Sequence, residues 1–212
     1  MSILLFKSNR QLSDEELMQR VSRGSESAFE ELYRRYVRRL QGFFFRQLGG
    51  DVDSAADFTH DVFLRIYEAR DRYEAGNNVA TWFFSIAYNL CKNVYRHNEQ
   101  VALYLSSLDD AEPQTDDDVE IKLDQERLEE ALWDVLQSLP PPLRLLFPLR
   151  YEEELTVPQI AQIEGIPEGT VKSRLHKTMC IIHQKLQHYD KESATPEQYQ
   201  RCGNHCRCPP SP

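Results

Sequence analysis

The side chains best suited to chemistry gather in the last part of the sequence, in the stretch QRCGNHCRC. Thiolates and an imidazole at short spacing suit Zn²⁺ or Cu⁺. The spacing C-x2-H-C-x-C is less specific than two paired CxxC motifs. Three interpretations stay open: a soft-metal site, a disulfide, and incidental thiols in an unstructured tail. The candidate ligands are Cys202, His205, Cys206 and Cys208.

Two further candidate ligands, Cys180 and His183, precede the tail, and His176 stands four residues before Cys180. In a helix, residues three and four apart share a face, so Cys180 and His183 could complete a site together with the tail. Helical cysteines and histidines are also commonly just packed. We expect no required cofactor, and Zn or Cu, or a similar soft metal, is the ion that the tail would take.

The sequence argues against an enzyme. It contains no Gly-rich phosphate loop and no Ser/His/Asp spacing, and catalysis requires groups held in a fixed geometry. The densest acidic run, SLDDAEPQTDDDVE, has seven carboxylates and no basic residue. Such a run cannot bury enough apolar surface to offset its ordering entropy, so we expect a flexible linker there.

The net charge of −9 is unevenly distributed along the chain. Residues 1–107 are neutral, residues 108–154 carry −11, and residues 155–212 carry +2. Both flanks are therefore free to face an anion such as nucleic acid. The first residues, MSILLFK, form an apolar run too short for a signal peptide or a membrane span. With five cysteines and no export signal, we expect a cytoplasmic protein with no membrane partner.

Helical periodicity appears on both sides of the acidic run, and no alternating strand pattern is present. The predicted fold is all-α, with two small helical domains joined by a flexible acidic linker and followed by a short Cys/His tail. Ser13 and Ser27 both begin stretches with capping-box spacing, and Asp53 is placed to cap a third helix. A fourth helix is expected over 79–97. The predicted boundaries are 12–98 for the first domain, 99–122 for the linker, 123–188 for the second domain and 189–212 for the tail.

After the linker, residues 123–139 are amphipathic and end at three consecutive prolines. A short apolar helix is expected over 143–151, kinked or ended early by Pro148. The stretch TVPQIAQIEGIPEGTVKSRLHK then predicts a helix-turn-helix, whose second helix can enter the major groove of DNA. Ile160, Val171 and Leu175 are expected on its packed side. The opposite side is basic, which fits either a solvated face or contacts to bases and phosphates.

Three stretches carry a resemblance to a known family. LPPPLRLLFPLRYEEELTVPQIAQIEGIPEGTVKSRLHK closely resembles region 4 of bacterial extracytoplasmic-function (group 4) sigma factors. AADFTHDVFLRIYEAR resembles region 2.2 of the same family, and ATWFFSIAYNLCKNVYRH resembles regions 2.3–2.4. The resemblance covers about residues 12–188 in the family's order, including the acidic linker.

The resemblance implies a protein that is not an enzyme. It would bind core RNA polymerase, direct it to promoter DNA with −10 and −35 elements, and help to melt the duplex. The implied polymerase-binding residues are Asp57, Phe58, Asp61, Phe63, Leu64 and Arg65. The implied −10 contacts are Trp82, Asn89 and Asn93. The implied −35 contacts are Lys172, Ser173, Arg174, His176 and Lys177.

Some features depart from the family's usual pattern. His60 and Ser85 stand where glutamine and a basic residue are common, which implies weaker phosphate attraction by the −10 domain. The Cys/His tail resembles the cysteine-rich extension by which a subgroup senses metal in place of a membrane anti-sigma partner. An anti-sigma factor is neither implied nor excluded. The alternative function is a helix-turn-helix transcription regulator that does not bind core polymerase.

Overall fold

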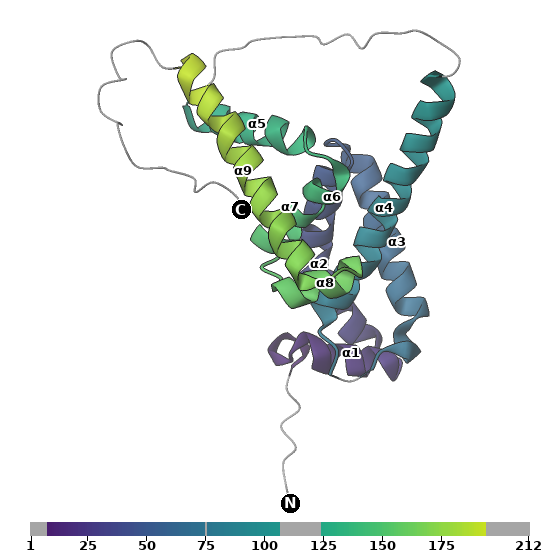
Figure 1. Ribbon diagram of the computed structural model, residues 1–212. Coiled ribbons are helices and arrows are strands. Elements are labelled where there is room, and N and C mark those ends of the chain that lie inside the picture. Colours follow the sequence, from purple (N-terminus) through teal and green to yellow (C-terminus); the bar gives the residue numbers. More distant parts are fainter. Residues whose placement is uncertain (1–7, 75, 107–123, 194–212) are drawn as a thin grey trace, which may run out of the picture.

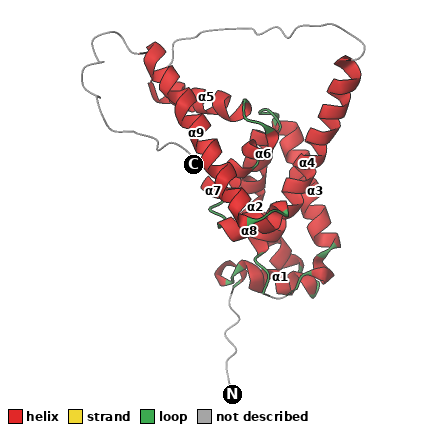
Figure 2. Ribbon diagram, in the orientation of Figure 1, coloured by secondary structure: helices red, strands yellow, loops and turns green. Residues whose placement is uncertain are grey.

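The computed structural model describes residues 8–74, 76–106 and 124–193. Within these ranges the regular secondary structure is helical and no strand occurs (Figure 2), which confirms the predicted all-α class. None of the helices in the described ranges is long and apolar enough to span a membrane. The elements are η1 (Asn9–Gln11), α1 (Asp14–Ser22), α2 (Glu26–Gln47), α3 (Val52–Glu68), η2 (Arg70–Arg72), α4 (Val79–Ser106), α5 (Asp124–Gln137), α6 (Pro141–Arg144), α7 (Leu146–Tyr151), α8 (Val157–Glu164) and α9 (Glu168–Ser193).

The capping box at the start of α1 is confirmed. The Ser13 hydroxyl accepts from the Glu16 backbone N–H at 3.1 Å, and the Glu16 carboxylate accepts from the Ser13 N–H at 2.8 Å. The cap of α2 was predicted wrongly, because Ser25 and not Ser27 accepts from the Ala28 N–H, at 3.4 Å. The helix begins one residue before Ser27, since the earlier serine already provides an acceptor for its first turn.

The cap of α3 also lies two residues earlier than predicted. The Asp51 carboxylate accepts from the backbone N–H groups of Asp53 and Ser54, at 3.1 and 3.2 Å. Asp53 therefore lies in the first turn, where its negative charge favours the helix N-terminus. At the other end of the N-terminal half, α4 continues beyond the predicted end at His97 to Ser106. Residues 98–106 contain no Gly or Pro that would stop it.

The segment around the prolines differs from the prediction. Two helices, α6 and α7, replace the single helix expected over 143–151, and the break falls at Leu145 and not at Pro148. Pro148 is the third residue of α7, where a backbone N–H would have no intrahelical acceptor. The proline is therefore tolerated in the first turn, and α7 ends only at Tyr151.

Helices α1–α4 form an N-terminal unit and helices α5–α9 a C-terminal unit, and the two share one continuous core. Phe83 and Phe84 of α4 belong to the same buried apolar cluster as Leu149 of α7 and Ile160 of α8. Figure 1 shows α8 lying against α4. A second, smaller cluster joins α5, α6 and α9, and it consists of Val135, Leu136, Leu139, Leu143 and Ile182. The sequence predicted two separate units and gave no sign of this contact between them.

Candidate nucleic-acid and polymerase interfaces

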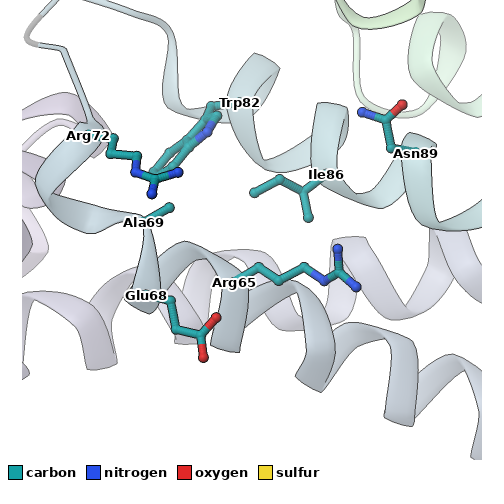
Figure 3. A pocket seen from close by; sticks show the side chains of 7 residues that line it. All are labelled: Arg65, Glu68, Ala69, Arg72, Trp82, Ile86 and Asn89. Atoms are coloured by element: carbon teal, nitrogen blue, oxygen red, sulfur yellow. The ribbon is translucent and has the colours of Figure 1, made fainter.

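A cavity lies between the end of α3 and the start of α4 (Figure 3). It has a volume of about 420 Å³. From α4, Trp82, Ile86 and Asn89 face Arg65 and Glu68 of α3 across it. The full lining consists of Arg65, Glu68, Ala69, Arg72, Trp82, Ile86 and Asn89.

The loop before α4 fixes the aromatic wall of this pocket. The Asn78 side chain caps α4 by accepting from the Thr81 N–H at 2.8 Å and from its hydroxyl at 3.0 Å. The Tyr73 hydroxyl donates to the Asn77 carbonyl, and its ring lies 5.6 Å from the Trp82 ring. The Trp82 ring therefore packs against Tyr73 of the loop. It also contacts the ring of Phe83, which is buried in the core.

Chemically, the pocket combines a flat indole, an amide, two guanidinium groups and the Glu68 carboxylate. A nucleobase can stack on an aromatic face whatever its identity, while cations attract the adjoining phosphates. Asn89 can both donate and accept hydrogen bonds at a base edge. Asn93, one turn further along α4, is exposed outside the pocket and accepts from Arg96 at 3.4 Å. The structure thus brings Trp82 and Asn89 together and leaves Asn93 apart.

The outward face of α3 carries most of the predicted polymerase contacts. Asp57, Asp61 and Leu64 are exposed, and Leu64 is 51% accessible despite being apolar. Phe63 is buried, 4.6 Å from the Tyr33 ring, and Phe58 is half-buried against Phe44. Both phenylalanines therefore hold α3 on the core, and the accessible surface is an acidic and apolar strip.

The helix-turn-helix consists of α8, a turn at Gly165 and the first turns of α9. Gly165 has φ 69° and ψ 35°, a left-handed conformation that favours glycine. The Gln159 side chain accepts from the Thr156 backbone N–H at 2.8 Å and so caps the start of α8. Val171 and Leu175 are buried, as the predicted packed side requires.

The predicted −35 residues do not all face solvent equally. Lys172, Ser173, His176 and Lys177 are exposed, and the Lys172 side chain is 67% accessible. Arg174 is different, because its Nη1 lies 2.7 Å from Oε2 of Glu164. Its side chain is only 33% accessible. An exposed basic surface remains at the N-terminal part of α9, which is where a recognition helix contacts base edges.

Two family models match this chain. "Sigma-70 region 2" matches residues 32–100, and "Sigma-70, region 4" matches residues 129–179. The RNA polymerase sigma factor CarQ of Myxococcus xanthus is 32% identical over 179 residues, covering 84% of this chain and 99% of CarQ. The chain belongs to the extracytoplasmic-function family of RNA polymerase sigma factors.

Further comparisons agree with this membership. The ECF RNA polymerase sigma-E factor of Haemophilus influenzae is 29% identical, covering 84% of this chain and 97% of the relative. Among solved structures, CnrH in complex with the cytosolic domain of CnrY has a TM-score of 0.63 at 20% identity. That likeness covers 82% of this chain and 97% of CnrH. The sigma factor RpoE of Bartonella quintana, solved with the anti-sigma factor NepR, has a TM-score of 0.59 at 19% identity, over 75% and 96% of the two chains. These two likenesses concern the fold.

The sigma factor's candidate metal residues are only partly described. Cys180 is exposed, and its Sγ lies 3.6 Å from Nε2 of His176. His183 follows one turn later on α9 and is also exposed. Within the described ranges, no group of three or more His, Cys, Asp or Glu side chains is placed to hold a metal ion. The tail candidates Cys202, His205, Cys206 and Cys208 lie outside the described residues.

Several residues of the pocket escaped sequence reasoning. Arg72, Ala69 and Ile86 line it but were not singled out, and Arg65 was assigned to polymerase alone. Arg65 lies in α3 and Arg72 in the following η2, so helical spacing along the sequence does not relate the two. The position of Arg72 in the pocket depends on the turn between α3 and α4, for which the sequence gave no signal.

Proposed function

We propose that this sigma factor divides its contacts among three surfaces. The exposed strip of α3 would bind core polymerase, the α3–α4 pocket would hold an unstacked base of the −10 element, and the start of α9 would contact the −35 element. The supporting observation is that Trp82 and Asn89 line one cavity together with Arg65 and Arg72. An aromatic ring, an amide and two cations suit a base with its phosphates.

Run-off transcription with core polymerase tests the pocket. We expect Asn89→Ala to lower transcript yield strongly and Asn93→Ala, outside the pocket, to lower it less. A promoter with a pre-melted −10 element separates two roles. If Asn89 binds the unstacked base, Asn89→Ala still lowers the transcript yield on the pre-melted template. If Asn89 acts only in melting, the yield of Asn89→Ala on that template returns to the wild-type level.

A pull-down with core polymerase tests the α3 strip. Asp61→Lys reverses the charge at an exposed position and should abolish capture of core polymerase. Asp53→Lys makes the same charge change in the first turn of α3, outside the proposed strip, and serves as the matched control. Equal binding by both variants would show that α3 is not the docking surface.

The proposed organisation follows the predicted boundaries: sigma region 2 over 12–98, a linker over 99–122 and sigma region 4 over 123–188. In this role the protein carries no catalytic residues of its own and acts in the cytoplasm, where polymerase and promoter DNA are. The alternative drawn from the sequence, a DNA-binding regulator that does not use polymerase, would account for region 4 and leave region 2 without a role.

An anti-sigma factor is a further proposed partner, since the related fold of RpoE was solved with one. Affinity purification from the native host tests that partner.

Metal control by the extension 189–212 is a separate proposal. Soft thiolates and an imidazole favour Zn²⁺ or Cu⁺ over hard cations. The nearby contact between Cys180 and His176 would bring an added ligand pair close to the −35 residues. Metal content of the purified protein and transcription with added Cu⁺, Zn²⁺ or Cd²⁺ test this idea. A Cys202/Cys206/Cys208→Ser variant that binds metal and responds like wild type would end it.

A further inference from the structure

One acidic side chain, Glu68, lines the α3–α4 pocket. The described lining also contains the guanidinium groups of Arg65 and Arg72 and the amide of Asn89. Glu68 is exposed, and its carboxylate forms no hydrogen bond or ion pair with another residue of the described chain. Figure 3 shows the Glu68 carboxylate and the Arg65 guanidinium pointing in different directions. The carboxylate is therefore available to accept hydrogen bonds from a bound ligand.

The position of Glu68 does not favour a negative charge. Glu68 is the last residue of α3, where the helix macrodipole carries partial negative charge and a cation would be more stable. A carboxylate in a nucleic-acid site also repels the phosphates. Both effects oppose a glutamate here, so the carboxylate needs a hydrogen-bond donor on the ligand to compensate for them.

The polar groups of the pocket differ in the hydrogen bonds that they form. A carboxylate only accepts hydrogen bonds, a guanidinium only donates them, and the Asn89 amide does both. Cytosine and adenine, called the amino bases below, carry an exocyclic amine beside an unprotonated ring nitrogen. Guanine and thymine, called the keto bases, carry a carbonyl oxygen beside a ring N–H. Glu68 can accept from the amine of an amino base, whereas the carbonyl oxygen of a keto base would place two acceptors against each other.

We propose that Glu68 is the specificity-determining residue of the pocket and selects an amino base at the unstacked position of the −10 element. This rests on the proposed function, because it requires the α3–α4 pocket to hold that base. Trp82 stacks on any base and so contributes affinity without selection. Arg65 and Arg72 attract phosphates whatever the sequence, and the Asn89 amide can turn to suit either kind of base. The Glu68 carboxylate is thus the group that an amino base satisfies and a keto base does not.

Binding of fork-junction promoters to the holoenzyme, meaning the full-length sigma factor with core polymerase, tests this selection. Each template has a pre-melted −10 element, and each position of its non-template strand carries each of the four bases in turn. At one position we expect an amino base to lower Kd roughly tenfold relative to a keto base, as a hydrogen bond to a charged group typically does. At that position Glu68→Gln, whose amide can also donate to a carbonyl, should reduce the preference to less than about threefold.

Glu74→Gln is the matched control. Glu74 is exposed in the loop after η2 and is not among the residues that line the pocket. The same loss of charge there should therefore keep the wild-type preference. Both substitutions are at exposed positions, and circular dichroism checks that the helices are intact.

The inference is overturned if the wild-type holoenzyme prefers no amino base at any −10 position, or prefers a keto base where Glu68→Gln alters binding. It is also overturned if Glu68→Gln keeps the full wild-type preference. A shift of the Kd for all four bases by one common factor would overturn it too, because that result indicates a general effect of charge. Failure of the proposed function looks different, because Asn89→Ala would then bind every template as tightly as wild type does.

Discussion

Replacing Gly165 by alanine should destabilise the helix-turn-helix through its backbone alone. The residue has φ 69°, and a Cβ built there would meet no atom within 4 Å. Space is therefore not the obstacle. A left-handed conformation costs a residue with a Cβ about 1–2 kcal/mol. The smaller conformational entropy of the unfolded alanine chain offsets about 0.4–1 kcal/mol of this.

The net loss expected for Gly165→Ala is thus about 1 kcal/mol of unfolding free energy. For a chain of this size that corresponds to a fall in Tm of roughly 2–4 °C. Urea unfolding followed by circular dichroism measures it, with the urea midpoint shifted at constant slope. Gly165→Asn should lose less, because asparagine tolerates the left-handed region.

Gly169 supplies a control of opposite sign in the same motif. It lies in the first turn of α9, and a Cβ there would also meet nothing within 4 Å. Because its backbone is helical, Gly169→Ala should be neutral or stabilise by up to about 1 kcal/mol. If both alanine variants shift the midpoint the same way, or if Gly165→Ala leaves it unchanged, the assignment of the cost to φ is refuted.

Three further outcomes are expected. Lys172→Ala should weaken binding to a −35 duplex and reduce the magnitude of the salt slope by about one, measured by fluorescence anisotropy across salt concentrations. Arg174→Ala should leave that slope nearly unchanged, because its guanidinium is occupied by Glu164; equal slope losses would show that Arg174 also contacts phosphate. Burial raises the pKa of Cys91 to about 12, so iodoacetamide at pH 8 should modify Cys180 and spare Cys91 until denaturant is added, as read by peptide mass spectrometry.

Features local in the sequence could be predicted well. The capping box at Ser13 and the turn at Gly165 depend on residues within one or two turns of each other, and both were found where expected. The misplaced cap of α2 shows the limit of this reasoning. Two serines stood close together, and a capping-box spacing at Ser27 outweighed the acceptor that Ser25 supplies.

Features that depend on distant residues could not be predicted. Arg39 and Glu153 are 114 residues apart, and no local pattern links them. The residues of the pocket could be predicted only in part. Trp82 and Asn89 came from the resemblance to sigma region 2, whereas Arg72 required the fold of η2 to be known. Residues 107–123 illustrate the same point, since a strongly acidic run suggested separation of the units and gave no sign of their contact.

Three glutamates, Glu152, Glu153 and Glu164, lie where the two units meet, and each forms an ion pair with an arginine. Burial is the largest influence on the pKa of Glu152, Glu153 and Glu164 and raises all three, even though an arginine lies beside each. Removing these charges from water therefore costs more than the ion pairs return, so the pairs specify an arrangement and add little net affinity. Removing one partner, in contrast, leaves an uncompensated buried charge, which is strongly unfavourable. An interface built this way takes its attraction from the shared apolar cluster, while the ion pairs fix one arrangement of the two units.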